Sequence, residues 1–96
     1  MFVVIFRAVA KNLDSEYSQT ASKLRELAMT EFNCIDFKAI TEGTDEIALS
    51  YWESLDDIKR WKAHPTHIKA QQLGRERWYE SYSVQIAEVD REYKFG

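Results

Sequence analysis

The chain has 96 residues, of which 45% are hydrophobic and 14% aromatic, and it carries a formal net charge of −3. This length suits one domain with one hydrophobic core. Charges of both signs are interspersed, so no basic stripe could follow a nucleic-acid backbone, and no apolar run approaches the ~20 residues of a membrane span. We therefore expect a single domain over residues 1–96, with neither nucleic acid nor membrane as a partner.

The only cysteine is Cys34, which cannot form a disulfide within the chain. The first residues lack the basic segment that begins a secretory signal peptide. Both features predict a reducing, cytoplasmic setting in which the thiol is inert.

Residues 2–9 are apolar on both alternating faces apart from Arg7, which is the pattern of a central strand covered on two sides. An Arg in such a strand requires either an ion pair or a ligand contact. Apolar residues then recur every three to four positions over residues 14–30, which predicts an amphipathic helix. Asp14 or Ser15 can cap its first turn.

The next segments alternate in polarity over residues 34–41 and 46–52, and they flank the turn-like residues 42–45. This arrangement predicts a β-hairpin with a four-residue loop.

Ser54 can cap a short helix that ends at Pro65 and turns three apolar residues inward: Leu55, Ile58 and Trp61. Thr66 can then cap a second helix from His67 to about Trp78. We interpret the charged residues near its end, Arg75, Glu76 and Arg77, as a solvated face.

The remaining residues, 79–95, are long for one strand, and their apolar positions change from even to odd numbers near Ala87. A β-bulge at Ala87 or Glu88 would restore one inward face. The predicted order β-α-β-β-α-β is that of an α+β ferredoxin-like, split βαβ fold, with both helices on one face of a four-stranded antiparallel sheet.

The helices can cover only one face of this sheet, yet the first strand is apolar on both faces. A homodimer that packs sheet against sheet would bury the second face, and the overlong last strand could reach the partner. The residues expected at this dimer interface are Val84, Ile86, Val89, Tyr93 and Phe95.

The segment "YWESLDDIKRWKAHPTHIKAQQLGRERWYESYSVQIAEV", residues 51–89, resembles the second half of antibiotic biosynthesis monooxygenase (ABM) domains. The shared features are a Trp that closes the third strand, a second Trp nine residues later, a His-Pro-x-His turn and a Tyr at the helix exit. The resemblance implies a dimeric α+β barrel. It also implies a cofactor-free monooxygenase of anthrones or quinols, a haem-degrading enzyme, or a relative without known activity.

Within this resemblance, Trp52 matches a cavity-lining Trp of the anthrone-oxidising branch, and Trp61 matches the second Trp of the haem-degrading branch. The haem-ligand position is Gln71 and the first strand has no Asn, which disfavours haem ligation and predicts neither metal nor other cofactor. The candidate substrate-binding residues are Trp52, Trp61, Tyr51, Arg7 and Ile58.

Oxygenation without metal or flavin requires an electron-rich substrate, a base and a dry pocket. His67 is the candidate catalytic base, because the positive end of a helix dipole disfavours imidazolium and keeps the ring able to accept a proton. The alternative is that His67, Trp52 and Trp61 only pack in the core. We expect Trp78, Tyr79 and Tyr82 to anchor the last strand and the dimer contact.

The sequence thus favours cofactor-free oxygenation of a small aromatic phenol, quinol or anthrone-like ligand. A non-catalytic small-molecule-binding or assembly dimer is the alternative, and haem degradation is the third possibility.

Overall fold

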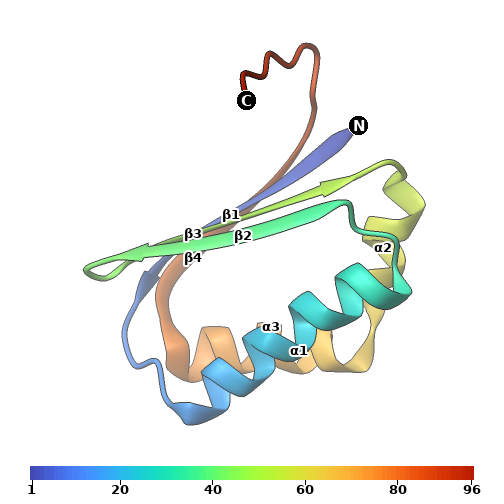
Figure 1. Cartoon of the computed structure of the whole chain (residues 1–96). Helices are drawn as coiled ribbons and strands as arrows, with labels where there is room; N and C mark the ends of the chain where they lie inside the picture. Colours follow the sequence, from blue (N-terminus) through green and yellow to red (C-terminus); the bar gives the residue numbers. More distant parts are fainter.

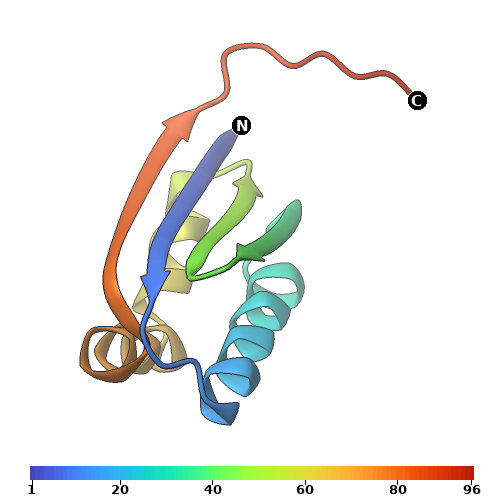
Figure 2. The ribbon, with the colours of Figure 1, turned by 90° about the vertical axis from the view of Figure 1, so that its left-hand side faces the viewer.

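The computed structural model describes all residues, 1–96, as one four-stranded antiparallel sheet with its helices on one face (Figures 1 and 2). The strand order is β2-β3-β1-β4, so the first strand is central, as predicted. The fold is the α+β ferredoxin-like arrangement. Its elements are β1 Phe2–Ala10, α1 Ser15–Glu31, β2 Asp36–Glu42, β3 Asp45–Trp52, α2 Leu55–Ala63, α3 Pro65–Leu73, the π-helical turn η1 Gly74–Trp78, and β4 Tyr79–Glu88.

Polar side chains fix where the helices begin. Asp14 accepts the Tyr17 N–H at 2.9 Å, and Ser54 accepts the N–H groups at the start of α2, so both predicted caps are confirmed. The predicted cap at Thr66 is wrong. The His64 ring accepts the Thr66 N–H at 3.1 Å, because Pro65 occupies the first position of α3, where the missing N–H of proline costs no hydrogen bond.

Two predicted boundaries in the second half also differ from the structure. The helix expected from His67 to Trp78 is α-helical only to Leu73 and then widens into η1. The irregularity in β4 lies opposite Val9 and Ala10, near the start of the strand, whereas a bulge at Ala87 or Glu88 was expected.

The strand β4 stops at Glu88 because its only neighbour, β1, runs out there. The last bond between them joins the Val89 N–H to the Met1 carbonyl at 2.9 Å. Residues 90–96 then leave the sheet, as Figure 2 shows.

The hairpin between β2 and β3 is tighter than predicted. Its loop is Gly43 and Thr44 alone, and Gly43 has a φ of +60° while Thr44 does not have a positive φ. A positive φ at only the first central position is the pattern of a type II′ turn, which glycine adopts without steric cost.

The core lies between the helices and the sheet, centred on two tryptophans. Trp52 is fully buried, with its ring centroid 5.2 Å from that of Trp61. The Trp52 indole N–H donates to Ser50 Oγ at 2.8 Å, and that of Trp61 donates to the Leu24 carbonyl at 3.1 Å. Both indole N–H groups are therefore hydrogen-bonded although they lie in an apolar layer.

The opposite face of the sheet has no helix over it (Figure 1). Ile40 and Ile47 pair across β2 and β3 and remain 59% and 42% exposed on this open face. In the tail beyond β4, Tyr93 and Phe95 are almost wholly exposed. None of the helices is long and apolar enough to cross a membrane.

Candidate active site

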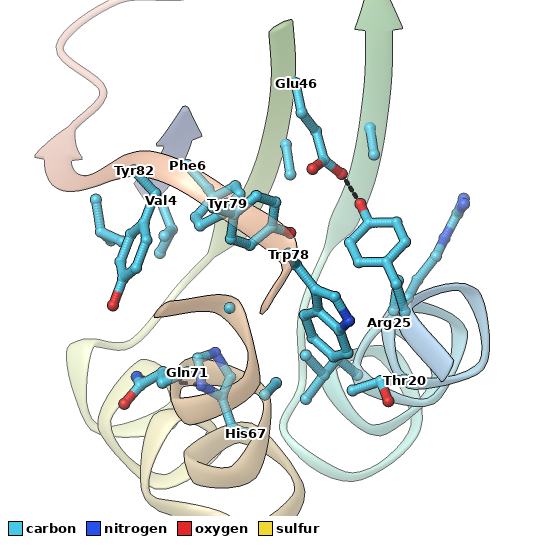
Figure 3. A pocket seen from close by; sticks show the side chains of 18 of the residues that line it. Val4, Phe6, Thr20, Arg25, Glu46, His67, Gln71, Trp78, Tyr79 and Tyr82 are labelled. Carbon is cyan, nitrogen blue, oxygen red and sulfur yellow. Dashed lines mark hydrogen bonds between the residues drawn. The ribbon is translucent and has the colours of Figure 1, made fainter. Parts of the chain in front are cut away.

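A cavity of about 290 Å³ lies between the helices and the covered face of the sheet, and Figure 3 shows it from close by. Its size is near the lower end of the ~300–1,000 Å³ typical of small-molecule pockets. Most lining residues are hydrophobic, and the Phe, Tyr and Trp rings among them come from six elements. The main contributors to these walls are Val4, Phe6, Trp61, Trp78, Tyr79 and Tyr82.

One polar end of the cavity is formed by α3. His67 places its ring edge-on to Trp61, with centroids 4.5 Å apart, and its Nδ1 lies 3.3 Å from the Gln71 side-chain nitrogen. Burial lowers the pKa of His67 from its usual 6.5 to about 4, and the nearby charges of Lys62 and His64 act in the same direction. The ring is therefore neutral at pH 7, chiefly because of burial, whereas the sequence argument relied on the helix dipole.

The other polar end is formed by β3 and α1. Glu46 is only 6% exposed, and its Oε1 accepts the hydroxyl proton of Tyr17, while its Oε2 is buried without a hydrogen-bond partner. The Tyr79 ring lies 6.1 Å from that of Tyr17. Burial and the adjacent carboxylate raise the pKa of both Tyr17 and Tyr79, so both stay protonated as hydrogen-bond donors.

Sequence reasoning missed Glu46 because a charged residue at a hairpin strand reads as solvated. The alternation along β3 could have indicated its position. Glu46 has an even number, as do Ser50 and Trp52, and the even-numbered residues of β3 face the helices.

The turn η1 directs two aromatic residues to the cavity. Trp78 is held by a 3.1 Å hydrogen bond from its indole N–H to Asp14 Oδ1, and Arg77 beside it pairs with Glu16 on α1. A Cβ on Gly74 would lie 3.0 Å from the Tyr79 ring, so that ring packs directly on the glycine. Trp78 and Tyr79 thus line the cavity, where the sequence analysis favoured a role in strand anchoring and the dimer contact.

The remaining candidates are distributed over three places in the fold. Of the predicted set, His67 and Trp61 border the cavity, and so does Val84, which was assigned to the dimer interface. Trp52 and Ile58 do not border it, because both are fully buried in the core.

Arg7 and Tyr51 point away from the cavity. Both are odd-numbered residues, and the odd-numbered residues of β1 and β3 face the open side of the sheet. There Arg7 is exposed and forms no ion pair. A role for them in substrate binding would require a second binding surface on that side.

The structure contains no group of three or more His, Cys, Asp or Glu side chains that could hold a metal ion. The fold and cavity together define a ferredoxin-like domain with an aromatic pocket between its helices and its sheet.

Comparison with known proteins places this domain among relatives that cover the whole chain. The chain is similar to the uncharacterised protein YqjZ of Bacillus subtilis, with 37% identity over 95 residues, or 98% of this chain and 83% of that protein. It is also similar to the jasmonate monooxygenase ABM of Pyricularia oryzae, with 32% identity over 94 residues. That match covers 93% of this chain but 43% of the fungal protein, so the chain spans less than half of its length.

Among solved structures, the fold matches SnoaB, a cofactor-independent oxygenase from Streptomyces nogalater. The TM-score is 0.78 at 11% identity, over 95% of this chain and 94% of that chain. No family model matches the sequence. The chain is nevertheless related to YqjZ over nearly its whole length, and its fold is that of solved structures described as antibiotic biosynthesis monooxygenases.

Proposed function

We propose that this protein is a cofactor-independent monooxygenase that oxidises a small aromatic phenol, quinol or anthrone-like substrate. The observation that carries the proposal is the aromatic cavity between the helices and the sheet, with a neutral imidazole at one end. The names of two similar proteins, a jasmonate monooxygenase and a cofactor-independent oxygenase, support oxygenation as the type of reaction.

Such a reaction balances without an added reductant. A phenol or quinol loses its hydroxyl proton, the resulting anion gives electrons to O₂, and one oxygen atom enters the ring or an activated CH₂ group. The other oxygen atom leaves as water, and the two electrons needed to reduce it come from the substrate. The protein has to bind the ring, accept and return protons, and exclude water.

His67 is the proposed proton acceptor, with Trp61 as a wall of the same pocket. The low pKa leaves the ring unprotonated at neutral pH and also weakens it as a base. The arrangement therefore favours substrates whose anions are stabilised by conjugation, as those of quinols and anthrones are.

The test is O₂ consumption by the purified protein with a panel of hydroquinones and anthrones. His67→Ala should lower the rate by about 10²-fold, the usual worth of a positioned acid or base. Lys69→Ala, on the exposed side of α3, is the matched control and should keep the rate. Full activity in His67→Ala, together with a lower melting temperature, would make His67 a packing residue only.

A second candidate function is binding of the same ligands without turnover. It is favoured by one observation: the only side-chain hydrogen bond of His67 is to Gln71, so no carboxylate orients the ring as it does in many acid–base pairs. Saturable ligand binding without O₂ consumption would select this function.

We also propose that two copies associate through the open face of the sheet. Ile40 and Ile47 on this face, and Tyr93 and Phe95 in the tail, supply apolar surface of the kind that obligate dimers bury, commonly ~2,000 Å² or more. In this arrangement Val89 and the tail reach the partner. Ile86, which was expected at the interface, pairs with Val4 and has the same parity as Val84, so it lies on the covered face of the sheet and not on the open one.

A further inference from the structure

Glu46 is unusual because it is a buried carboxylate with one oxygen left over. The side chain is almost wholly buried, Tyr17 satisfies Oε1, and Oε2 has no partner. Buried polar atoms are nearly always hydrogen-bonded, and leaving one unpaired destabilises the fold, the more so for a charged group. Glu46 borders the cavity, so a molecule bound there could supply the missing hydrogen bond.

The surroundings of Glu46 indicate which chemical group of a ligand would form the missing hydrogen bond to Oε2. No Lys, Arg or His pairs with this carboxylate. The Tyr79 hydroxyl lies close enough to interact with Glu46, but its geometry makes no hydrogen bond to Oε2 in this structure. The other charged residues of the lining are Arg25 and Lys62, so the cavity as a whole is not anionic and has no general preference for a cation. Aromatic rings form most of the wall near the carboxylate, which favours a flat ligand with a polar edge.

The two polar ends of the cavity are separated. Figure 3 shows Glu46 on one side and His67 with Gln71 on the other, with Trp78 and Tyr79 drawn between them. A ligand that reaches from one end to the other must pass these rings and present a polar group at each end.

We propose that Glu46 is a specificity-determining residue whose Oε2 accepts a hydrogen bond from a hydroxyl group of the substrate, at the end remote from His67. This inference rests on the proposed function and adds to it that the substrate is an aromatic ring system with polar groups at opposite ends. Tyr17 holds the carboxylate in place from α1 through its hydrogen bond to Oε1, and Oε2 has no hydrogen-bond partner.

The expected selectivity follows from the charge on the acceptor. A hydrogen bond to a charged group contributes ~1.5–3 kcal/mol, which corresponds to about a 10- to 100-fold difference in affinity. A ligand that replaces the hydroxyl by a methoxy group loses this bond and also leaves Oε2 desolvated and unpaired.

The experiment is a calorimetric or tryptophan-fluorescence titration without turnover, using naphthalene-2,6-diol, naphthalen-2-ol and 2,6-dimethoxynaphthalene as probes. The wild-type protein should bind the diol at least about tenfold more tightly than the diether. In Glu46→Gln, the amide oxygen can still accept the hydrogen bond from Tyr17. The NH₂ group then takes the place of Oε2, and it donates a hydrogen bond where the carboxylate oxygen would accept one. The diol should lose about tenfold in affinity there, while the diether binds equally well or better.

Glu42→Gln is the matched control, because Glu42 belongs to the same hairpin but lies on the open side of the sheet. It should leave the ratio of diol to diether affinity unchanged. Circular dichroism and a thermal melt establish that each variant is folded. If Glu46→Gln disturbs folding, Glu46→Asp provides a second test: it keeps the carboxylate but shortens the side chain by one methylene, so the ratio of diol to diether affinity should fall, and an unchanged ratio would overturn the inference.

An unchanged ratio of diol to diether affinity in folded Glu46→Gln would overturn the inference, even if the enzyme consumes O₂. Conversely, a preference for the diol that depends on Glu46, without O₂ consumption, would support the inference and contradict the oxygenase function. Failure of all three probes to bind would overturn both.

Discussion

The buried imidazole of His67 predicts a pH dependence of stability with a definite sign. The pKa of His67 is about 4 in the folded protein and 6.5 when the side chain is in water. Between these pH values the unfolded chain binds a proton that the folded chain does not, so the free energy of unfolding must rise with pH. Linkage lowers the free energy of unfolding by about 2 kcal/mol on going from pH 7 to pH 5. The total loss, once the pH is below both pKa values, is about 3 kcal/mol.

The assay is urea unfolding at pH 7 and pH 5 for the wild-type protein and His67→Gln. Carboxylates also titrate in this range, so the quantity to compare is the difference between the two proteins. The wild-type protein should lose about 2 kcal/mol more than His67→Gln, while His64→Gln keeps the wild-type pH dependence because His67 remains. Equal pH dependence in all three proteins would refute the inference that His67 is buried and neutral.

Trp52→Phe removes the bond to Ser50 and part of the core volume, so the free energy of unfolding should fall by about 2 kcal/mol while ligand affinity in titrations stays unchanged. A selective loss of binding would instead place Trp52 at the site. Gly74→Ala should lower both melting temperature and ligand affinity, because a methyl group 3.0 Å from the Tyr79 ring outweighs the gain of ~1 kcal/mol in helix propensity; a more stable variant would contradict this. Deletion of residues 90–96 should weaken the dimer and lower its melting temperature together, and sedimentation of the full chain as a folded monomer at micromolar concentration would exclude the dimer.

The strand order could be predicted because each strand carries its own pattern. The two apolar faces of residues 2–9 placed that strand in the middle of the sheet, and Asp14 and Ser54 marked the helix starts by a local rule that needs no tertiary information. The end of β4 could not be predicted in the same way, because it depends on where the neighbouring strand begins.

The cavity was harder to predict because it is a property of packing. Trp52 and Trp61 have similar sequence signals, yet the first is wholly enclosed by the core and the second reaches the cavity wall. Trp78 and Tyr79 enter the lining through a π-helical turn, which changes the rotation per residue and so shifts both side chains from the face that an α-helix would give them. The position of Glu46 at the cavity could not be predicted without knowing that the space beside it is left open.

The most direct test of an oxygenase function is a reaction of the purified protein with a hydroquinone or anthrone under ¹⁸O₂, followed by mass spectrometry of the product. A monooxygenase that uses the substrate's own electrons should give a product with one ¹⁸O atom, at a rate that falls about 10²-fold in His67→Ala. Label incorporation no faster than in protein-free solution, with substrate bound in the cavity, would contradict the oxygenase function and leave a ligand-binding domain.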